Sequence, residues 1–233
     1  MADSTFDEKH WDDRFDALEN AVRERSIPSA SWGVIVDILQ NARVVASYIH
    51  GTDDTFAALT ECTKRARRTL RVTRLAPRSL AVSNVPYMNA VYQSVKDPAN
   101  DNKPHVHEYL RLVAINNKDK KQDVIETILH CYGAPMDIYL TLAEYGFELL
   151  LADTQEAFIM FSDEHDTISS ALYLRGTDLA SELEKVFDNM LTRSIVDVIN
   201  CSEINDDNIS GYLQRVSAAW DTAAERTTAN SRL

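Results

Sequence analysis

The sequence predicts an α/β fold, a mixed β-sheet flanked by helices, with helical appendages at the N- and C-termini. Three observations predict it. The 233 residues are 45% hydrophobic and 26% charged, an ordinary globular composition that can build a sizeable core. Strand-like and helix-like runs alternate over the central part of the chain. Amphipathic stripes at helical spacing lie toward both ends.

The first 41 residues are predicted to be a helical segment. A stripe of apolar residues at spacings of four, three and four runs along an acidic helix over residues 7–25: Trp11, Phe15, Leu18 and Val22. A second apolar segment extends from Trp32 to Ile49. Its early part has helical spacing, whereas Val44 to Ile49 could instead be a short strand.

The middle of the chain, residues 42–193, is predicted to be the α/β domain. After a turn at 51–54, helices are expected at 52–67, 86–95 and 118–132, and strands at 69–75, 109–115 and 137–142. Strands that alternate with helices indicate βαβ units and a largely parallel arrangement. Three further strand-like runs, at 147–152, 157–161 and 167–174, are separated by short polar turns and should be antiparallel neighbours.

A helix over 178–191 is expected to close this domain, and residues 194–233 are predicted to be a C-terminal helical tail. An apolar stripe runs along the tail: Ile209, Leu213, Val216 and Trp220. Such a stripe packs either within one chain or between two copies. With an amphipathic helix at each end, we expect a homodimer.

The net charge of −12 argues against a protein whose whole surface wraps nucleic acid. The charge is uneven, however. Residues 64–78 contain seven basic and no acidic residues, whereas residues 137–166 contain eight acidic and no basic ones. Nucleic-acid binding through the 64–78 block therefore stays an alternative, and solvated charge runs are the structural interpretation of both segments.

No apolar run approaches the roughly 18 residues of a membrane-spanning helix, and the first 25 residues are acidic. We therefore expect a cytoplasmic protein with no membrane partner. Cys62, Cys131 and Cys201 stand far apart without a CxxC pair, so they are predicted to be buried thiols. No pattern typical of a dinucleotide, P-loop or zinc site occurs, so neither a cofactor nor a metal is predicted.

Several phrases from about residue 42 to 191 resemble phospholipase D-like domains of small prokaryotic proteins and regulators. They are GTDDTFAALTECTKRARRTLRVTR, EYLRLVAINNKDKKQDVI, IYLTLAEYGFELLLAD and EAFIMF…ISSALYLRG. Active members of that family carry H-x-K-x4-D, in which the His attacks phosphorus and the Lys holds phosphate oxygens. Aligning Asp153 with the motif's Asp puts Gly146 at the nucleophile and Glu148 at the lysine, and no second copy of the motif is present. The resemblance thus implies the fold without its chemistry.

Ligands of open α/β sheets usually bind beyond the carboxyl ends of the parallel strands. The polar residues predicted there are Arg74, Asn116, Asn117, Thr141 and Tyr145. Glu148 and Asp153 lie on or beside an apolar strand, so each needs a basic partner, for which Arg111 or Arg74 is available. Capping and buried salt bridges are the structural interpretation. The functional interpretation is a pocket for a phosphate-bearing or otherwise anionic small molecule.

The sequence therefore predicts a catalytically degenerate domain that acts as a ligand-sensing or interaction module. One alternative is an enzyme that uses Glu148, Asp153 and His165 as acids and bases on a phosphoester or nucleotide. The other is a nucleic-acid-binding accessory protein that uses the 64–78 block.

Overall fold

The computed structural model describes residues 45–75, 84–95, 106–115, 118–143, 147–162, 168–192 and 195–230. These residues form one eight-stranded sheet in the order β1-β7-β6-β5-β2-β3-β4-β8. The strands are β1 (Val45–His50), β2 (Thr69–Arg74), β3 (Glu108–Ala114), β4 (Met136–Thr141), β5 (Phe147–Ala152), β6 (Glu156–Ser162), β7 (Ile168–Arg175) and β8 (Ile195–Asn200). The central strands β2, β3 and β4 are parallel, and the other pairings are antiparallel.

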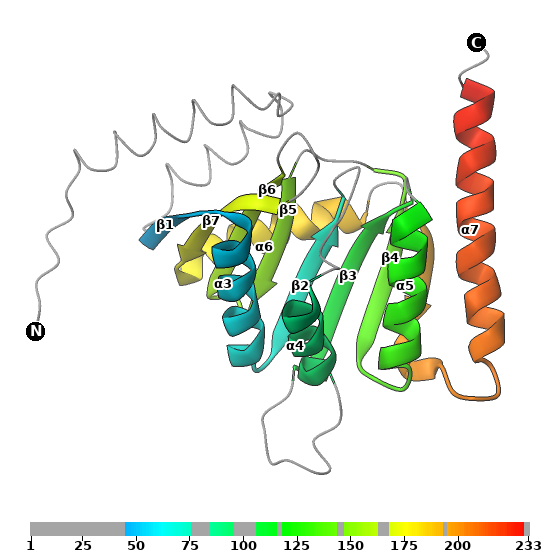
Figure 1. Ribbon diagram of the computed structural model, residues 1–233, viewed down its shortest axis with the longest axis horizontal. Coiled ribbons are helices and arrows are strands. Elements are labelled where there is room, and N and C mark those ends of the chain that lie inside the picture. The colour runs from blue at the N-terminus through cyan, green and yellow to red at the C-terminus, as the bar shows by residue number, and fades with distance from the viewer. Residues whose placement is uncertain are drawn as a thin grey trace, which may run out of the picture.

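Helices cover both faces of the sheet (Figure 1). They are α3 (Thr52–Arg65), α4 (Val85–Val95), α5 (Lys118–Cys131), α6 (Thr177–Leu191), the short η3 (Cys201–Glu203) and α7 (Ile209–Asn230). The first three lie on one face and α6 lies on the other, while α7 stands beside α5 at the β8 end. None of the described helices is long and apolar enough to cross a membrane.

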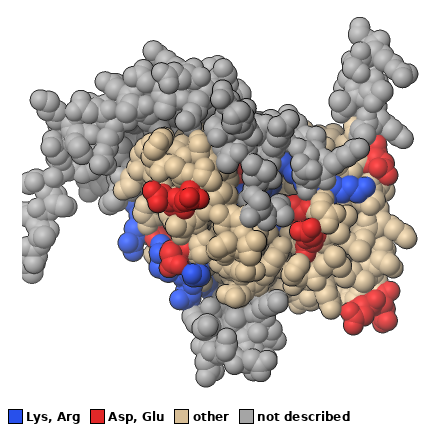
Figure 2. Space-filling view, in the orientation of Figure 1, with Lys and Arg blue, Asp and Glu red and all other residues tan. Residues whose placement is uncertain are grey.

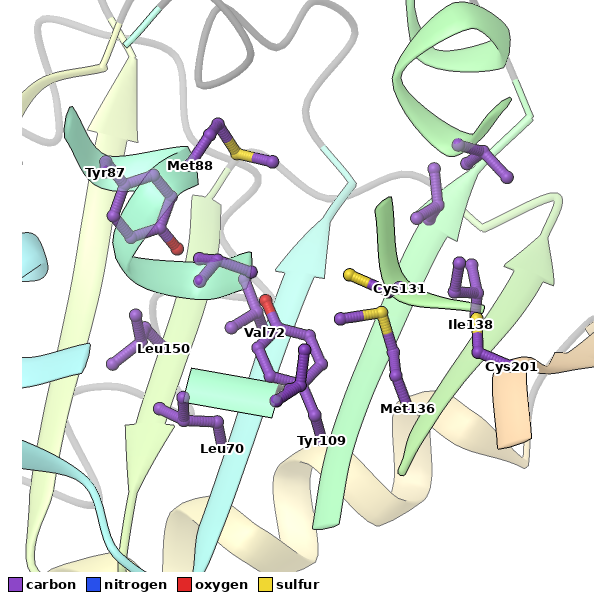
Figure 3. Close-up of a cluster of buried hydrophobic side chains, with 14 of the residues drawn as sticks. Leu70, Val72, Tyr87, Met88, Tyr109, Cys131, Met136, Ile138, Leu150 and Cys201 are labelled. Carbon is purple, nitrogen blue, oxygen red and sulfur yellow. The ribbon is translucent and has the colours of Figure 1, made fainter. Parts of the chain in front are cut away.

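The larger of two apolar cores fills the space between the sheet and α3, α4, α5 and α7. Figure 3 shows how it is built: Leu70 and Val72 project from β2 toward Tyr87 of α4, and Met136 projects from β4 toward Cys131 of α5. The smaller core lies between the sheet and α6. Because successive side chains of a strand point to opposite faces, Leu70 and Val72, two residues apart on β2, lie in the same core.

The order and type of the central elements agree with the sequence prediction. Residues 45–50, for which helix and strand were both considered, form the strand β1, which pairs with β7. Strands β5, β6 and β7 are antiparallel to one another in sequence order, as their short turns predicted. All three cysteines are buried, also as predicted. The helices predicted before residue 42 lie outside the described residues.

The C-terminal region differs from the prediction of a purely helical tail. Residues 195–200 form β8, which pairs antiparallel with β4 as the edge strand of the sheet. The physical reason is burial, because Ile199 and Cys201 are completely covered in the larger core. Val216 and Trp220 of α7 join the same core, so the stripe of the tail packs within the chain. The domain boundaries themselves stay a prediction.

Candidate functional site

A group of charged side chains lies buried between the sheet and helices α4 and α5. We refer to it as the buried charge cluster: Arg74, Arg111, Lys120, Asp123 and Glu148. Its strand residues share one face because of strand alternation. Arg74 follows Leu70 and Val72 on β2, and Glu148 precedes Leu150 on β5, all on the side of the larger core.

Arg74 and Glu148 form an ion pair with a distance of 2.7 Å between the guanidinium Nη1 and the carboxylate Oε2. Both side chains are only 2% exposed. The antiparallel register of β2 and β5 explains the pair. Val72 lies opposite Leu150, so Arg74, two residues later on β2, lies beside Glu148, two residues earlier on β5. Burial acts to lower the pKa of Arg74, but Glu148, together with Tyr87 and Asp123, outweighs burial and raises the pKa. The Arg74 guanidinium therefore stays charged.

Arg111 of β3 is held by α5. Its guanidinium donates to the Asp123 carboxylate and to the Thr127 hydroxyl, and all three side chains are buried. Burial acts to lower the pKa of Arg111, but Asp123 and Tyr109 together outweigh burial and raise the pKa. Lys120, one helical turn before Asp123, donates from Nζ to the Arg74 carbonyl oxygen at 3.1 Å. Helix α5 thus contacts both the end of β2, at Arg74, and the middle of β3, at Arg111.

Tyr87 of α4 packs against the Arg74 guanidinium. Its ring centroid lies 5.7 Å from Cζ of Arg74, a distance typical of a cation–π contact. Burial raises the pKa of Tyr87, so its hydroxyl keeps its proton. Within the part of the chain that the structure describes, the Tyr87 hydroxyl, Nε of Arg74, Nε of Arg111 and Oδ1 of Asp123 are buried without a hydrogen-bond partner.

Asp153 lies away from this cluster, at the other end of β5. Glu148 faces the end of β2, whereas Asp153 contacts its beginning, and five residues of strand correspond to about 16 Å. The Asp153 carboxylate accepts the backbone N–H groups of Arg67, Arg68 and Thr69 at 2.7, 2.6 and 2.9 Å. Asp153, whose own φ is 53°, thereby holds the loop between α3 and β2 in place.

The structure therefore brings Arg74, Arg111 and Glu148 together and separates Asp153 from them. Thr141 is buried at the end of β4, where its hydroxyl accepts the N–H of Ala143 at 3.0 Å. The remaining predicted site residues, Asn116, Asn117 and Tyr145, lie outside the described residues, as do Gly146 and His165. Ligand binding by these residues stays a proposal.

Sequence reasoning missed Lys120, Asp123 and Tyr87. For the two α5 residues a signal was present. Asp123 and Thr127 are four residues apart, and they share a helix face with the apolar Val124 and Ile128. Polar residues on a buried helix face need partners, and the buried face of the preceding strand carries Arg111. Tyr87 gave no comparable signal, because a tyrosine on an apolar helix face is ordinary core.

The basic block at 64–78 divides into buried and exposed residues. Arg74 is buried, and Arg71 pairs with Asp188 of α6 at 3.1 Å. The exposed members are Lys64, Arg65, Arg67 and Arg68. Acidic residues lie among them, since Lys64 pairs with Glu61 and Arg65 with Glu156. Figure 2 shows the same mixture, with basic and acidic side chains interspersed at the lower left.

No protein-family model and no curated protein sequence matches the chain. Solved structures of similar fold include the archaeal chromatin protein TrmBL2, which has a novel mode of DNA binding: identity is 10%, the TM-score is 0.45, and the match covers 80% of this chain and 67% of that one. NucT from Helicobacter pylori has 12% identity and a TM-score of 0.46, with 66% of this chain and 100% of that one covered.

Nuc from Salmonella typhimurium, a phospholipase D family member, has 8% identity and a TM-score of 0.46, with 65% of this chain and 97% of that one covered. A phospholipase D family member is thus among the solved structures to which this chain is similar.

Proposed function

We propose that this chain is a phospholipase D-like domain that lacks the family's catalytic chemistry and works as a ligand-sensing or interaction module. Glu148 carries the proposal. In the resemblance it stands where a lysine would hold phosphate oxygens, and its carboxylate is buried and paired with Arg74 at 2.7 Å. A carboxylate in that position repels a phosphodiester and occupies the nearest guanidinium.

The other two motif positions support the proposal. Gly146 has no side chain that could attack phosphorus, so a covalent intermediate has no nucleophile. Asp153, which does match the motif, is engaged by three backbone N–H groups and serves the α3–β2 loop. The alternative enzyme needs Glu148 and Asp153 in one site, but they contact opposite ends of β2.

The proposed ligand is an anionic small molecule that carries phosphate. Three cationic side chains, Arg74, Arg111 and Lys120, converge where β2 and β3 meet the first turns of α5. Helix N-termini and the carboxyl ends of parallel strands are common positions for anions. Nucleic-acid binding is the second candidate, favoured by the four exposed basic residues at 64–68.

The test combines hydrolysis with binding. The full chain is expected to hydrolyse bis(p-nitrophenyl) phosphate no faster than buffer does. Nucleotides or phosphosugars are expected to raise the thermal unfolding midpoint, because a ligand of the folded state stabilises it. Turnover that is abolished by Glu148→Gln would contradict the proposal.

Arg68→Ala is the matched control for the second candidate, since Arg68 is exposed and outside the buried charge cluster. If the exposed basic residues bind nucleic acid, the affinity for oligonucleotides should fall steeply as salt is added. Arg68→Ala should lower that affinity and leave the change in unfolding midpoint caused by small molecules unaltered. Oligonucleotide binding that is absent or insensitive to salt eliminates that candidate.

A further inference from the structure

The two edges of the sheet differ in what meets their outward-facing backbone groups. At the β8 edge, the N–H of Val198 donates to the Asp197 carboxylate at 2.8 Å, and the Val198 carbonyl oxygen accepts from the Arg215 guanidinium at 3.1 Å. Arg215 also pairs with Asp197 at 2.6 Å. Charged side chains thus occupy the middle of this edge, which is a common way in which proteins prevent edge-to-edge pairing.

Strand β1 is the opposite edge of the sheet, with β7 on its inner side (Figure 1). Within the described part of the chain, no strand pairs with its outer side. Its sequence, VASYIH, contains no Asp, Glu, Lys, Arg or Pro, the residues that protect exposed edges. An unprotected edge of this kind is a template for another strand.

The register of β1 on β7 identifies the residues whose backbone groups face outward. Gly51, directly after the strand, donates its N–H to the Ser169 carbonyl oxygen at 2.9 Å. Bonded and non-bonded residues alternate along an antiparallel pair, so Ile49 and Ser47 also turn their N–H and C=O groups toward β7. The residues that turn these groups outward are Ala46, Tyr48 and His50.

We propose that the β1 edge binds the β1 edge of a second copy of this chain, as an antiparallel pair on a two-fold axis. With Tyr48 opposite Tyr48 of the second copy, Ala46 lies opposite His50, and all three outward-facing residues of each copy have a partner. Each such pair exchanges two hydrogen bonds, so the contact supplies about six. The two sheets then continue as one across the axis.

The side chains of this edge suit a second copy. Ile49 packs against the larger core, so Tyr48 and His50 lie on the other face of the strand. Tyr48 is 43% exposed, and its ring stacks on His50 with 6.3 Å between the centroids. On the axis the two Tyr48 rings become cross-strand neighbours, which is a favourable aromatic pair. A two-fold interface is self-complementary, so β1 alone provides both halves.

The inference goes beyond the proposed function and needs no ligand. It has its own salt dependence. Each copy carries a formal net charge of −12, so two copies repel each other, and added salt should strengthen the dimer by screening that repulsion. Binding of nucleic acid has the opposite dependence, because salt weakens it.

The experiment is sedimentation equilibrium of the full chain over a range of protein concentrations, at low and at high salt. Tyr48→Pro removes an outward-facing N–H from both halves of the dimer and no hydrogen bond to β7. It should therefore raise the dimer dissociation constant at least about tenfold. Val198→Pro is the matched control, because it removes an outward-facing N–H at the other edge and should leave association unchanged.

Tyr48→Lys repeats the test without altering the backbone, since it places two ammonium groups opposite each other on the axis. A dimer that withstands both Tyr48 variants would overturn the inference and favour another interface. A full chain that stays monomeric at every concentration would also overturn it, and slow hydrogen exchange of the Tyr48 amide in that monomer would show that the chain itself covers the edge. The proposed function would survive either result, since it rests on Glu148.

Discussion

Glu148 and Arg74 form an ion pair in the core, so removing one partner has a much larger effect than removing both. Glu148→Ala leaves the Arg74 guanidinium buried without its carboxylate, and it should destabilise the chain by about 3–5 kcal/mol. The double variant Arg74→Met with Glu148→Leu replaces the pair by apolar groups of similar volume. It should be near neutral or more stable than the original chain.

Urea unfolding of the single and double variants measures this difference. A cost below about 1 kcal/mol for Glu148→Ala would show that water reaches the pair, as at exposed ion pairs. The double variant controls for local packing, since it keeps the volume of the site.

Glu156 joins α3 to β6 and β7 through a half-buried network. Its carboxylate accepts the Tyr173 hydroxyl at 2.6 Å and the Arg65 guanidinium at 3.2 Å, and the Cys62 thiol donates to it at 3.3 Å. Burial acts to raise the pKa of Glu156, but the three donors outweigh it and hold the pKa below the ordinary value. The ionised carboxylate therefore stabilises the folded state.

The stabilisation is present above the ordinary glutamate pKa of about 4.3 and is lost as the pH falls through the lower pKa of the folded state. Glu156→Gln should thus be less stable than the original chain at pH 7, and the difference should shrink as the pH drops below about 4. Unfolding midpoints across the acid range measure it. Glu61→Gln, which removes only an exposed pair with Lys64, is the control and should change little. A difference that persists unchanged into acid would contradict the assignment.

At the scale of elements, sequence periodicity predicted the helices and strands whose pattern lies within one short segment. Strands β2 to β7 and helices α3 to α6 appear where short apolar runs and helical spacings place them, because both patterns are local to one segment of the chain. Residues 45–50 were ambiguous, since only pairing with β7 distinguishes a strand from a helix there. Pairing partners far apart in sequence are not visible in a local pattern.

The same reason explains why β8 was missed. Its six residues include two polar ones, and most of its side chains are partly exposed. What makes it a strand is pairing with the edge of β4, which places Ile199 opposite Ile138, 61 residues earlier in the sequence. The candidate site was predictable in part for a related reason. A charged residue on an apolar strand indicates that an oppositely charged residue is buried beside it. The sequence does not identify which of several candidate residues that partner is.

At the scale of the whole molecule, the sheet extends past the predicted domain end at residue 193. The edge strand β8 pairs with β4, η3 packs against β4, and α7 packs against α5 and β8. Ile199, Cys201 and Val216 are completely buried in the core that also contains β2 and β3. The stability of the central domain should therefore depend on residues after 193. Self-association through the terminal helices stays a prediction.

A chain of residues 1–193 is expected to lose cooperative unfolding. Each large apolar side chain removed from the core costs about 1.5–3 kcal/mol of burial, and a domain is stable by only about 5–15 kcal/mol in total. Removing Ile199, Val216 and Trp220 costs much of that range and also exposes the edge of β4.

A chain of residues 1–223 is the matched control, since it keeps every described buried side chain of α7 and should unfold like the full chain. Circular dichroism melts of the three chains compare them. If the 1–193 chain melts cooperatively at the midpoint of the full chain, then residue 193 is a true domain boundary and β8 is an accessory strand, because the core would have proved complete without it.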